Sequence, residues 1–171
     1  MVRDVNAALV SLEDYLAASY SPDREYVDGA VREIHGGEAP HSKVQLNLVL
    51  AFDRLRPNLH IWPKQRVRTG PSRVRVPDLC ITLDDPRSSI FEGPPFLCIE
   101  IVSARDGASD LLEKLEEYAA MGVRHIWVLD PRRRKAYASF RTAGLVLEEI
   151  GRLAAGEAGV SLDLNEVFRG V

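Results

Sequence analysis

A strand, a helix and a second strand follow one another between residues 96 and 130, and this succession constrains the fold more than any other part of the sequence. Residues 96–102 form an apolar run that is typical of a core strand. Apolar side chains at helical spacing predict a helix over residues 110–121 that ends at Gly122, and residues 125–130 are again mainly apolar. Two strands joined by one helix over this distance form a parallel, right-handed crossover, so the sequence predicts an α/β protein.

Weaker patterns outline the rest of the chain. Ser11, followed three positions later by an acid, predicts the start of a short helix. The dipeptide Asp28-Gly29 tolerates positive φ and predicts a hairpin between residues 24–27 and 30–34. Apolar residues at helical spacing predict a largely buried helix over residues 41–55. The remaining pattern predicts two extended segments, a long loop, two strands and a short closing helix, over residues 60–67, 73–83, 84–95, 135–141, 145–150 and 161–168.

Length and composition limit the kind of protein. With 171 residues, 46% of them hydrophobic and 27% charged, the chain is expected to form one globular domain over residues 1–171. There is no signal-peptide pattern and no apolar run of roughly 20 residues, so a cytoplasmic protein without a membrane partner is expected. The net charge of -3 argues against a general nucleic-acid coat protein, although a locally basic groove could still bind nucleic acid.

Two carboxylates lie in segments that are otherwise apolar. Asp78 begins one such segment, and Glu100 lies inside the strand over residues 96–102. An ionised carboxylate in an apolar strand must be paired, hydrogen-bonded or bound to a metal, which indicates a functional site. If the two segments are antiparallel neighbours, one register sets Asp78 opposite Glu100 and necessarily sets Cys80 opposite Cys98.

Such a register would create a metal site. Facing carboxylates repel unless a cation lies between them, and Mg²⁺ prefers one or two such oxygens together with water and phosphate. The ion can bind a phosphate and lower the pKa of a bound water. Lys114 is the candidate that would orient this water or offset developing charge, because it shares one helix face with Asp110 and Tyr118 after the Glu100 strand.

Several of these residues also have purely structural interpretations. Asp110 and Glu113 have the spacing of a capping box, and Asp110 and Lys114 have the spacing of a helix ion pair. Asp78 could accept hydrogen bonds at the start of a strand. His41 begins the predicted helix over residues 41–55 and could reach the site as a ligand or base, or could be a packed residue.

Two further groups of residues leave alternatives open. Cys80 and Cys98 show no CxxC spacing and are expected to be reduced core residues, with a redox pair as the minor alternative. The basic residues either contact phosphate at the mouth of the site or are solvated edge and turn residues. These are Lys64, Arg66, Arg68, Arg73, Arg75 and residues 132–135.

An ordered set of short motifs spans nearly the whole chain. Along the sequence these are Glu25-Tyr26-Val27-Asp28-Gly29, His41 with its apolar helix, Pro77-Asp78, Ile99-Glu100-Ile101-Val102-Ser103, Asp110, Lys114, Tyr118, Gly122-Val123 and Val128-Leu129-Asp130-Pro131. In this order they resemble the PD-(D/E)XK nuclease superfamily and, more closely, the Uma-type family of restriction-endonuclease-like proteins. The resemblance implies a central mixed β-sheet flanked by helices, in the order αβββαβ, with an N-terminal helix and β-hairpin.

The resemblance also implies roles for particular residues. The implied catalytic set consists of Asp78, Glu100, Lys114, His41 and Glu25. Within it, Asp78 and Glu100 hold Mg²⁺ or Mn²⁺ with the backbone carbonyl of Ile101, and His41 is a further candidate ligand. Lys114 takes the place of the lysine that the superfamily usually carries two positions after the glutamate, where Val102 stands here.

The leading interpretation is a metal-dependent endonuclease that hydrolyses phosphodiester bonds of nucleic acid, with DNA expected rather than RNA. The alternative is a non-catalytic nucleic-acid-binding or assembly module, since a fold alone does not establish activity. A homodimer is plausible because a single domain of this size cuts one strand at a time. Convergence of Asp78, Glu100 and Lys114 on one pocket would favour the enzyme, whereas a Lys114 directed to solvent would favour the module.

Overall fold

The computed structural model describes residues 9–34, 38–56, 58–105, 107–142 and 144–171. The helices are α1 (Leu12–Ala17), α2 (Ala39–Leu55), α3 (Ala108–Met121) and α4 (Leu164–Val167), with a 3-10 turn, η1, at Gly156–Ala158. The strands are β1 (Arg24–Val27), β2 (Ala30–Glu33), β3 (His60–Pro63), β4 (Val67–Gly70), β5 (Arg73–Arg75), β6 (Leu79–Thr82), β7 (Leu97–Ile101), β8 (His125–Asp130), β9 (Lys135–Thr142), β10 (Gly144–Ile150), β11 (Arg152–Ala155) and β12 (Val160–Asp163).

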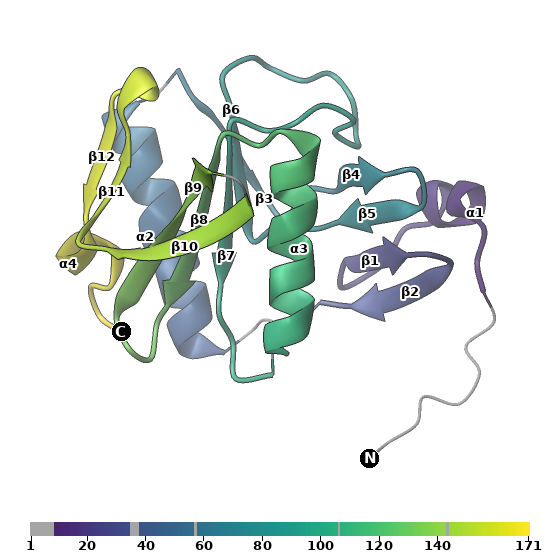
Figure 1. The fold of residues 1–171 in the computed structure, drawn as a ribbon, viewed down its shortest axis with the longest axis horizontal. Helices are drawn as coiled ribbons and strands as arrows, with labels where there is room; N and C mark the ends of the chain where they lie inside the picture. Colours follow the sequence, from purple (N-terminus) through teal and green to yellow (C-terminus); the bar gives the residue numbers. More distant parts are fainter. Residues whose placement is uncertain (1–8, 35–37, 57, 106, 143) are drawn as a thin grey trace.

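A six-stranded mixed sheet forms the centre of the molecule, with the strand order β10-β9-β8-β7-β6-β3. β7 and β8 are parallel, as expected for strands joined through α3, and the other neighbours are antiparallel. α2 covers one face of the sheet and α3 covers the other (Figure 1). The predicted α/β architecture, a mixed sheet flanked by helices, is therefore confirmed.

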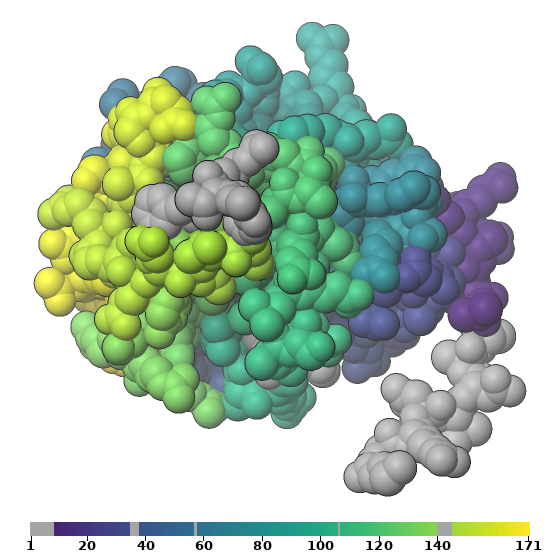
Figure 2. Space-filling view, in the orientation of Figure 1, coloured from purple at the N-terminus to yellow at the C-terminus, as the bar shows by residue number. Residues whose placement is uncertain are grey.

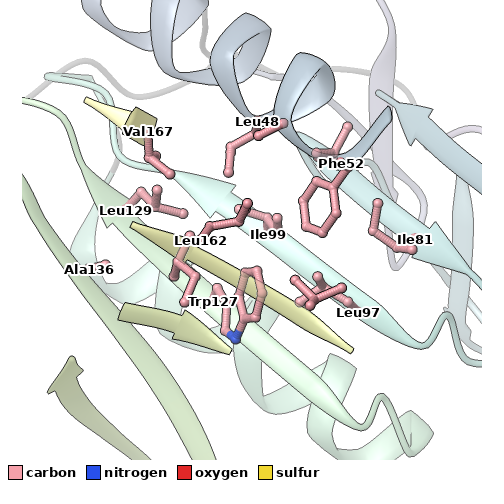
Figure 3. Packing of buried hydrophobic residues seen from close by; sticks show 14 of the residues in the cluster. Leu48, Phe52, Ile81, Leu97, Ile99, Trp127, Leu129, Ala136, Leu162 and Val167 are labelled. Carbon is pink, nitrogen blue, oxygen red and sulfur yellow. The ribbon is translucent and has the colours of Figure 1, made fainter. Parts of the chain in front are cut away.

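The main hydrophobic core lies between α2 and the six-stranded sheet. Leu48 and Phe52 point from α2 towards Ile99 and Trp127 of the sheet (Figure 3). The rings of Phe52 and Trp127 stack with centroids 6.2 Å apart, and all four side chains are buried. Burying one such side chain stabilises the fold by about 1.5–3 kcal/mol, so this face holds the central strands in place. The opposite face of the same strands is therefore available to carry polar groups under α3.

A four-stranded sheet with the order β2-β1-β5-β4 lies beside α3, next to α1 (Figure 1). The predicted hairpin is confirmed, because β1 pairs with β2 and both turn residues have positive φ, 49° at Asp28 and 93° at Gly29. The predicted N-cap is also confirmed, since the Ser11 hydroxyl accepts a hydrogen bond of 3.0 Å from the Asp14 N–H. Figure 2 shows α3 at the surface between this sheet and the C-terminal strands.

Each of the two predicted extended segments is divided between the two sheets. Within residues 60–67, β3 joins the larger sheet and β4 the smaller one, and Lys64 lies between them with a φ of 52°. Within residues 73–83, β5 ends before Val76 and Pro77, and β6 begins after Asp78. Pro77 has no N–H to donate, and the Val76 N–H donates to a side chain rather than to a ladder. These two crossings place Lys64 and Asp78 at the junction of the sheets.

The prediction of a closing helix over residues 161–168 is wrong for its first part. Residues Val160–Asp163 form β12, which pairs with β11 in a separate two-stranded sheet. Alternating burial along β12 is a strand signal of period two. The helix α4 begins only after Asp163, whose carboxylate accepts a hydrogen bond of 2.8 Å from the Asn165 N–H.

The predicted burial of α2 also needs correction. Leu46 and Leu50 are about half exposed, at 50% and 51%, because they lie on the side of the helix that faces away from the sheet. Val44, Leu48 and Phe52 form the buried face. None of the helices in the described part of the chain has the length and hydropathy of a membrane span.

Candidate active site

A buried group of charged side chains lies where the two sheets meet α3. It includes Glu25 from β1, Asp78 beside β6, Glu100 from β7 and Lys114 from α3, which together line a cavity of about 90 Å³. A cavity of this size has room for several water molecules. The structure thus brings together four of the residues that the sequence singled out.

The pairing of β6 with β7 sets two of the carboxylates side by side. Cys80 lies opposite Cys98 in the antiparallel ladder, which confirms the predicted register, and continuing that ladder brings Asp78 opposite Glu100. Both cysteines are free and buried. Burial raises the pKa of the Cys80 thiol to about 12 and that of Cys98 well above its usual value. Protonated, inaccessible thiols argue against redox chemistry here.

Asp78 is held by groups on several elements. One carboxylate oxygen, Oδ2, accepts a hydrogen bond of 2.7 Å from the Ile101 N–H, and the other, Oδ1, forms an ion pair with Lys64. The backbone carbonyl of Asp78 accepts a hydrogen bond of 2.7 Å from the Gln45 side chain. Burial by itself would raise the pKa of Asp78, but the neighbouring His41 and Lys64 outweigh it and hold the pKa below its usual value. Asp78 is therefore an oriented, ionised carboxylate.

His41 reaches the same group from the first turn of α2. Its Nε2 atom lies 3.0 Å from Asp78 Oδ1, and its side chain is only 3% exposed. Among the residues that the structure describes, this nitrogen finds no hydrogen-bond partner of acceptable geometry. A buried polar atom without a hydrogen bond is costly, so this nitrogen beside a carboxylate is a candidate ligand for a cation bound by Asp78.

Glu100 is buried on the face of the sheet that α3 covers. Its Oε2 atom lies 3.1 Å from Lys114 Nζ, and its Oε1 atom accepts a hydrogen bond of 2.7 Å from the Tyr118 hydroxyl. Burial raises the pKa of Glu100 to about 7; Lys114 opposes this rise, and the charges of Asp78 and Glu25 add to it. Because burial is the largest cause of this rise, a positive charge added beside Glu100 would favour its ionised form.

Lys114 points into the cavity, where its side chain is 15% exposed. Its Nζ atom also lies 3.0 Å from Glu25 Oε1, so the ammonium bridges carboxylates from both sheets. Burial alone would lower the pKa of Lys114, but Glu100, Glu25 and Asp78 outweigh it, and the pKa is raised. Lys114 is thus a fixed cation.

The local structural roles considered for the start of α3 are not found. The N-cap is Gly107, so Asp110 and Glu113 do not form a capping box. Asp110 is largely exposed and lies 3.7 Å from Arg32, whereas Lys114 pairs with Glu25 and Glu100. A buried pair of carboxylates attracts the ammonium more strongly than an exposed one, because water screens the exposed charge.

Arg75 is not a phosphate contact at the mouth of the site, contrary to one interpretation of the basic residues. Its side chain is 1% exposed and donates hydrogen bonds to carboxylates of Glu25 at 3.0 Å, Glu117 at 2.6 Å and Glu113 at 3.0 Å. Glu25 therefore lies between two cations, Arg75 and Lys114. The acids of α3 attach that helix to the smaller sheet through this guanidinium.

Sequence reasoning missed the structural importance of two residues in particular. Arg75 lies close before Pro77-Asp78, and its acidic partners Glu113 and Glu117 have helical i,i+4 spacing, which was a usable signal for a shared face. Lys64 was one of the basic residues expected either to contact phosphate at the mouth of the site or to be solvated, and its pairing with Asp78 was not predicted. The pairing of Lys64 with Asp78 arises because the chain passes from the larger sheet to the smaller one after β3, and no local sequence pattern predicts this passage.

The residues present suit a hard divalent cation. In the described ranges there is no cluster of three or more His, Cys, Asp or Glu side chains that could enclose a metal on their own. Mg²⁺ does not require one, because it keeps several waters and binds through one or two carboxylates and substrate phosphates. Asp78 and Glu100 are two such carboxylates, and the buried Nε2 of His41 beside Asp78 lacks a hydrogen bond. The donor set therefore fits Mg²⁺ or Mn²⁺.

Comparisons with known proteins bear on the fold and on the family of this chain. A crystal structure described as a putative nuclease belonging to DUF820 from Anabaena variabilis ATCC 29413 matches with a TM-score of 0.78 and 15% identity, covering 93% of this chain and 97% of that one. At this identity the likeness shows a common fold. Among curated proteins, no sequence matches this chain. A family model described as "Uma2: Putative restriction endonuclease" matches residues 12–170, and the chain therefore belongs to the Uma2 family.

Proposed function

We propose that this protein is a metal-dependent endonuclease that hydrolyses phosphodiester bonds, with DNA as its substrate. The convergence of Asp78, Glu100 and Lys114 on one cavity carries the proposal. Two oriented carboxylates beside a fixed ammonium suit the hydrolysis of a phosphodiester, because the reaction needs an activated water and positive charge near the phosphate. Membership of a family described as restriction endonucleases supports a nucleic-acid substrate.

In this proposal Asp78 and Glu100 hold Mg²⁺ or Mn²⁺, with the Ile101 carbonyl and His41 as further candidate ligands. The bound ion would supply a water of lowered pKa and a contact to phosphate. Asp78 is already oriented for this role by the Ile101 N–H. Each carboxylate oxygen can accept more than one bond, so the hydrogen bonds present leave room for a cation.

Lys114 supplies the protein's own positive charge beside Glu100. An ammonium held 3.1 Å from that carboxylate can donate a hydrogen bond to the attacking water or to a phosphate oxygen as negative charge grows. Glu25 positions Lys114 by contacting it at 3.0 Å from the opposite side. Lys114 would thus fill the role that the resemblance gives to a lysine two positions after the glutamate. Here Val102 of the chain stands at that position, and the lysine comes from α3.

The second candidate is a non-catalytic module that keeps the fold. One observation favours it: Arg73 and Arg75 are engaged with Glu113 and Glu117, so these basic residues offer less positive charge to nucleic acid. The position of Lys114 inside the cavity favours the enzyme.

Cleavage assays separate the two candidates. Single-stranded, double-stranded and branched DNA, and the matching RNAs, are incubated with the protein and Mg²⁺ or Mn²⁺. Wild type is compared with Glu100→Ala and Lys114→Ala, and with Glu116→Gln, an exposed acid on α3, as the control. We expect cleavage of DNA that both alanine variants lose and the control retains. Activity unchanged by both alanine substitutions would contradict the proposal. Sedimentation of the same samples tests whether the protein acts as a homodimer.

A further inference from the structure

Lys64 is a second lysine at the site. The sequence contains four lysines, Lys43, Lys64, Lys114 and Lys135, and two of them line the cavity. Lys64 follows β3, where Pro63 pairs with Leu79 of β6, and its own N–H contacts the Asp78 carbonyl at 3.3 Å. The backbone thus fixes Lys64 next to Asp78.

The backbone conformation of Lys64 is unusual. Its φ of 52° lies in the left-handed region, which residues with a side chain rarely adopt. Glycine or asparagine would meet this requirement more easily, yet the position carries a long cationic side chain. That side chain turns back to the cavity and forms an ion pair with Asp78 Oδ1. The turn therefore directs an ammonium at the candidate active site.

Lys64 differs from Lys114 in how its ammonium is used. Lys114 contacts carboxylates on two sides and its side chain is 15% exposed. The side chain of Lys64 is 26% exposed, and within the described part of the chain Asp78 is its one side-chain partner. An ammonium has three donors, so Lys64 keeps donors for a molecule that arrives from solvent.

We propose that Lys64 is a substrate-contacting residue, which binds a backbone phosphate of the DNA strand that lies over the Asp78–Glu100 cavity. This inference rests on the proposed nuclease function. The Asp78 carboxylate already accepts a hydrogen bond from the Ile101 N–H and lies beside His41. If the Lys64 ammonium served only to neutralise Asp78, it would not need to be exposed to solvent. A lysine that binds phosphate as a point charge needs that position.

The dependence of DNA binding on salt tests this role directly. A short fluorescent DNA duplex is titrated with protein in Ca²⁺, a hard oxygen-binding cation, at several KCl concentrations, and binding is followed by anisotropy. The slope of log K against log salt is negative, and removing one phosphate contact decreases its magnitude by about 0.9. We expect this decrease for Lys64→Gln, and a slope close to wild type for Lys64→Arg. Lys43→Gln, which removes an exposed lysine outside the cavity, should keep the wild-type slope.

The outcomes distinguish this inference from the proposed function. A wild-type slope for Lys64→Gln would overturn the role of Lys64, while loss of cleavage in Glu100→Ala would still support a nuclease. Absence of DNA binding by wild type would overturn both. Removal of the lysine could leave Asp78 without its cation, so the double variant Lys64→Gln/Asp78→Asn is measured too. Because Asp78 is itself a proposed metal ligand, this double variant is compared with Asp78→Asn alone, and its salt slope should be smaller in magnitude than that of Asp78→Asn by the same amount.

Discussion

Lys114 Nζ lies 3.1 Å from Glu100 Oε2 and 3.0 Å from Glu25 Oε1, so a single ammonium on α3 joins the two sheets of the molecule. Glu100 belongs to the six-stranded sheet and Glu25 to the four-stranded one. A charge in this position contributes to stability and, in the proposed nuclease, to chemistry.

Replacing Lys114 by methionine should destabilise the protein by about 3–5 kcal/mol, because it leaves the buried Glu100 without its cation and removes one of the two cations that contact Glu25. Lys114→Arg keeps the positive charge and should therefore lose less unfolding free energy than Lys114→Met. Urea unfolding followed by circular dichroism measures both, with Lys43→Met as an exposed control. Equal stability of Lys114→Met and wild type would show that the carboxylates do not depend on this ammonium.

Arg75 and Arg73 form a matched pair on one strand. Both contact Glu113 and Glu117, but the side chain of Arg75 is 1% exposed and that of Arg73 is 27% exposed. Arg75→Gln should cost about 3–5 kcal/mol of unfolding free energy, whereas Arg73→Gln should cost no more than about 1 kcal/mol, because water screens the outer pair. Urea unfolding measures the loss of unfolding free energy in each variant. Similar losses for Arg75→Gln and Arg73→Gln would contradict the stronger contribution expected from the buried arginine.

Removing metal or a proposed ligand should abolish cleavage. EDTA should stop the reaction, and excess Mg²⁺ should restore it. Asp78→Asn and Glu100→Gln should each weaken Mn²⁺ binding by at least about 100-fold, since loss of an outer partner alone can reach that value. Isothermal titration calorimetry measures the affinity, with Glu116→Gln as control. Unchanged Mn²⁺ affinity in both variants would remove Asp78 and Glu100 from the metal site.

Tyr118→Phe should shift the pH dependence of cleavage. The Tyr118 hydroxyl donates to Glu100 Oε1 at 2.7 Å and favours the ionised form of that carboxylate. The pKa of Glu100, raised to about 7 chiefly by burial, should rise further without this donor. Cleavage that needs ionised Glu100 increases as the pH rises through this pKa, so the rising limb should move to higher pH. A pH–rate profile that does not move would show that Tyr118 acts only in packing.

Asp130 should make stability depend on acidic pH. Burial would raise the pKa of Asp130, but hydrogen bonds from Arg133 and Arg132 N–H groups, at 3.0 Å each, and from the Arg133 guanidinium outweigh it and lower the pKa. A lowered pKa means that the unfolded chain binds more protons in this range. The stabilisation that Asp130 contributes is therefore complete above its pKa in the unfolded chain, about 4, and is lost as the pH falls through its pKa in the folded protein. Unfolding free energies measured from neutral to acidic pH should fall less steeply for Asp130→Asn than for wild type.

Local patterns predicted much of the architecture. The crossover through α3 followed from apolar runs and a helical period, and the β1–β2 hairpin followed from Asp28-Gly29. The register of Cys80 with Cys98 followed from the constant sum of an antiparallel ladder. The β11–β12 pair was missed, because short alternating segments near the end of a chain give a weak signal that a helix pattern can imitate.

By itself, the sequence determined the crossover through α3, the β1–β2 hairpin and, once β6 and β7 pair in antiparallel fashion, the placement of Asp78 opposite Glu100, because strand alternation and antiparallel register are local, periodic properties. The tertiary structure alone decided which charges are buried together. Arg75 and Arg73 look alike in the sequence, and Lys64 looks like a surface lysine, yet Arg75 is enclosed by carboxylates and Lys64 meets Asp78. The strength of an ion pair depends on how completely the surrounding segments exclude water from it. Those segments are distant in the sequence, so the spacing of residues along the chain does not predict which ion pairs are buried.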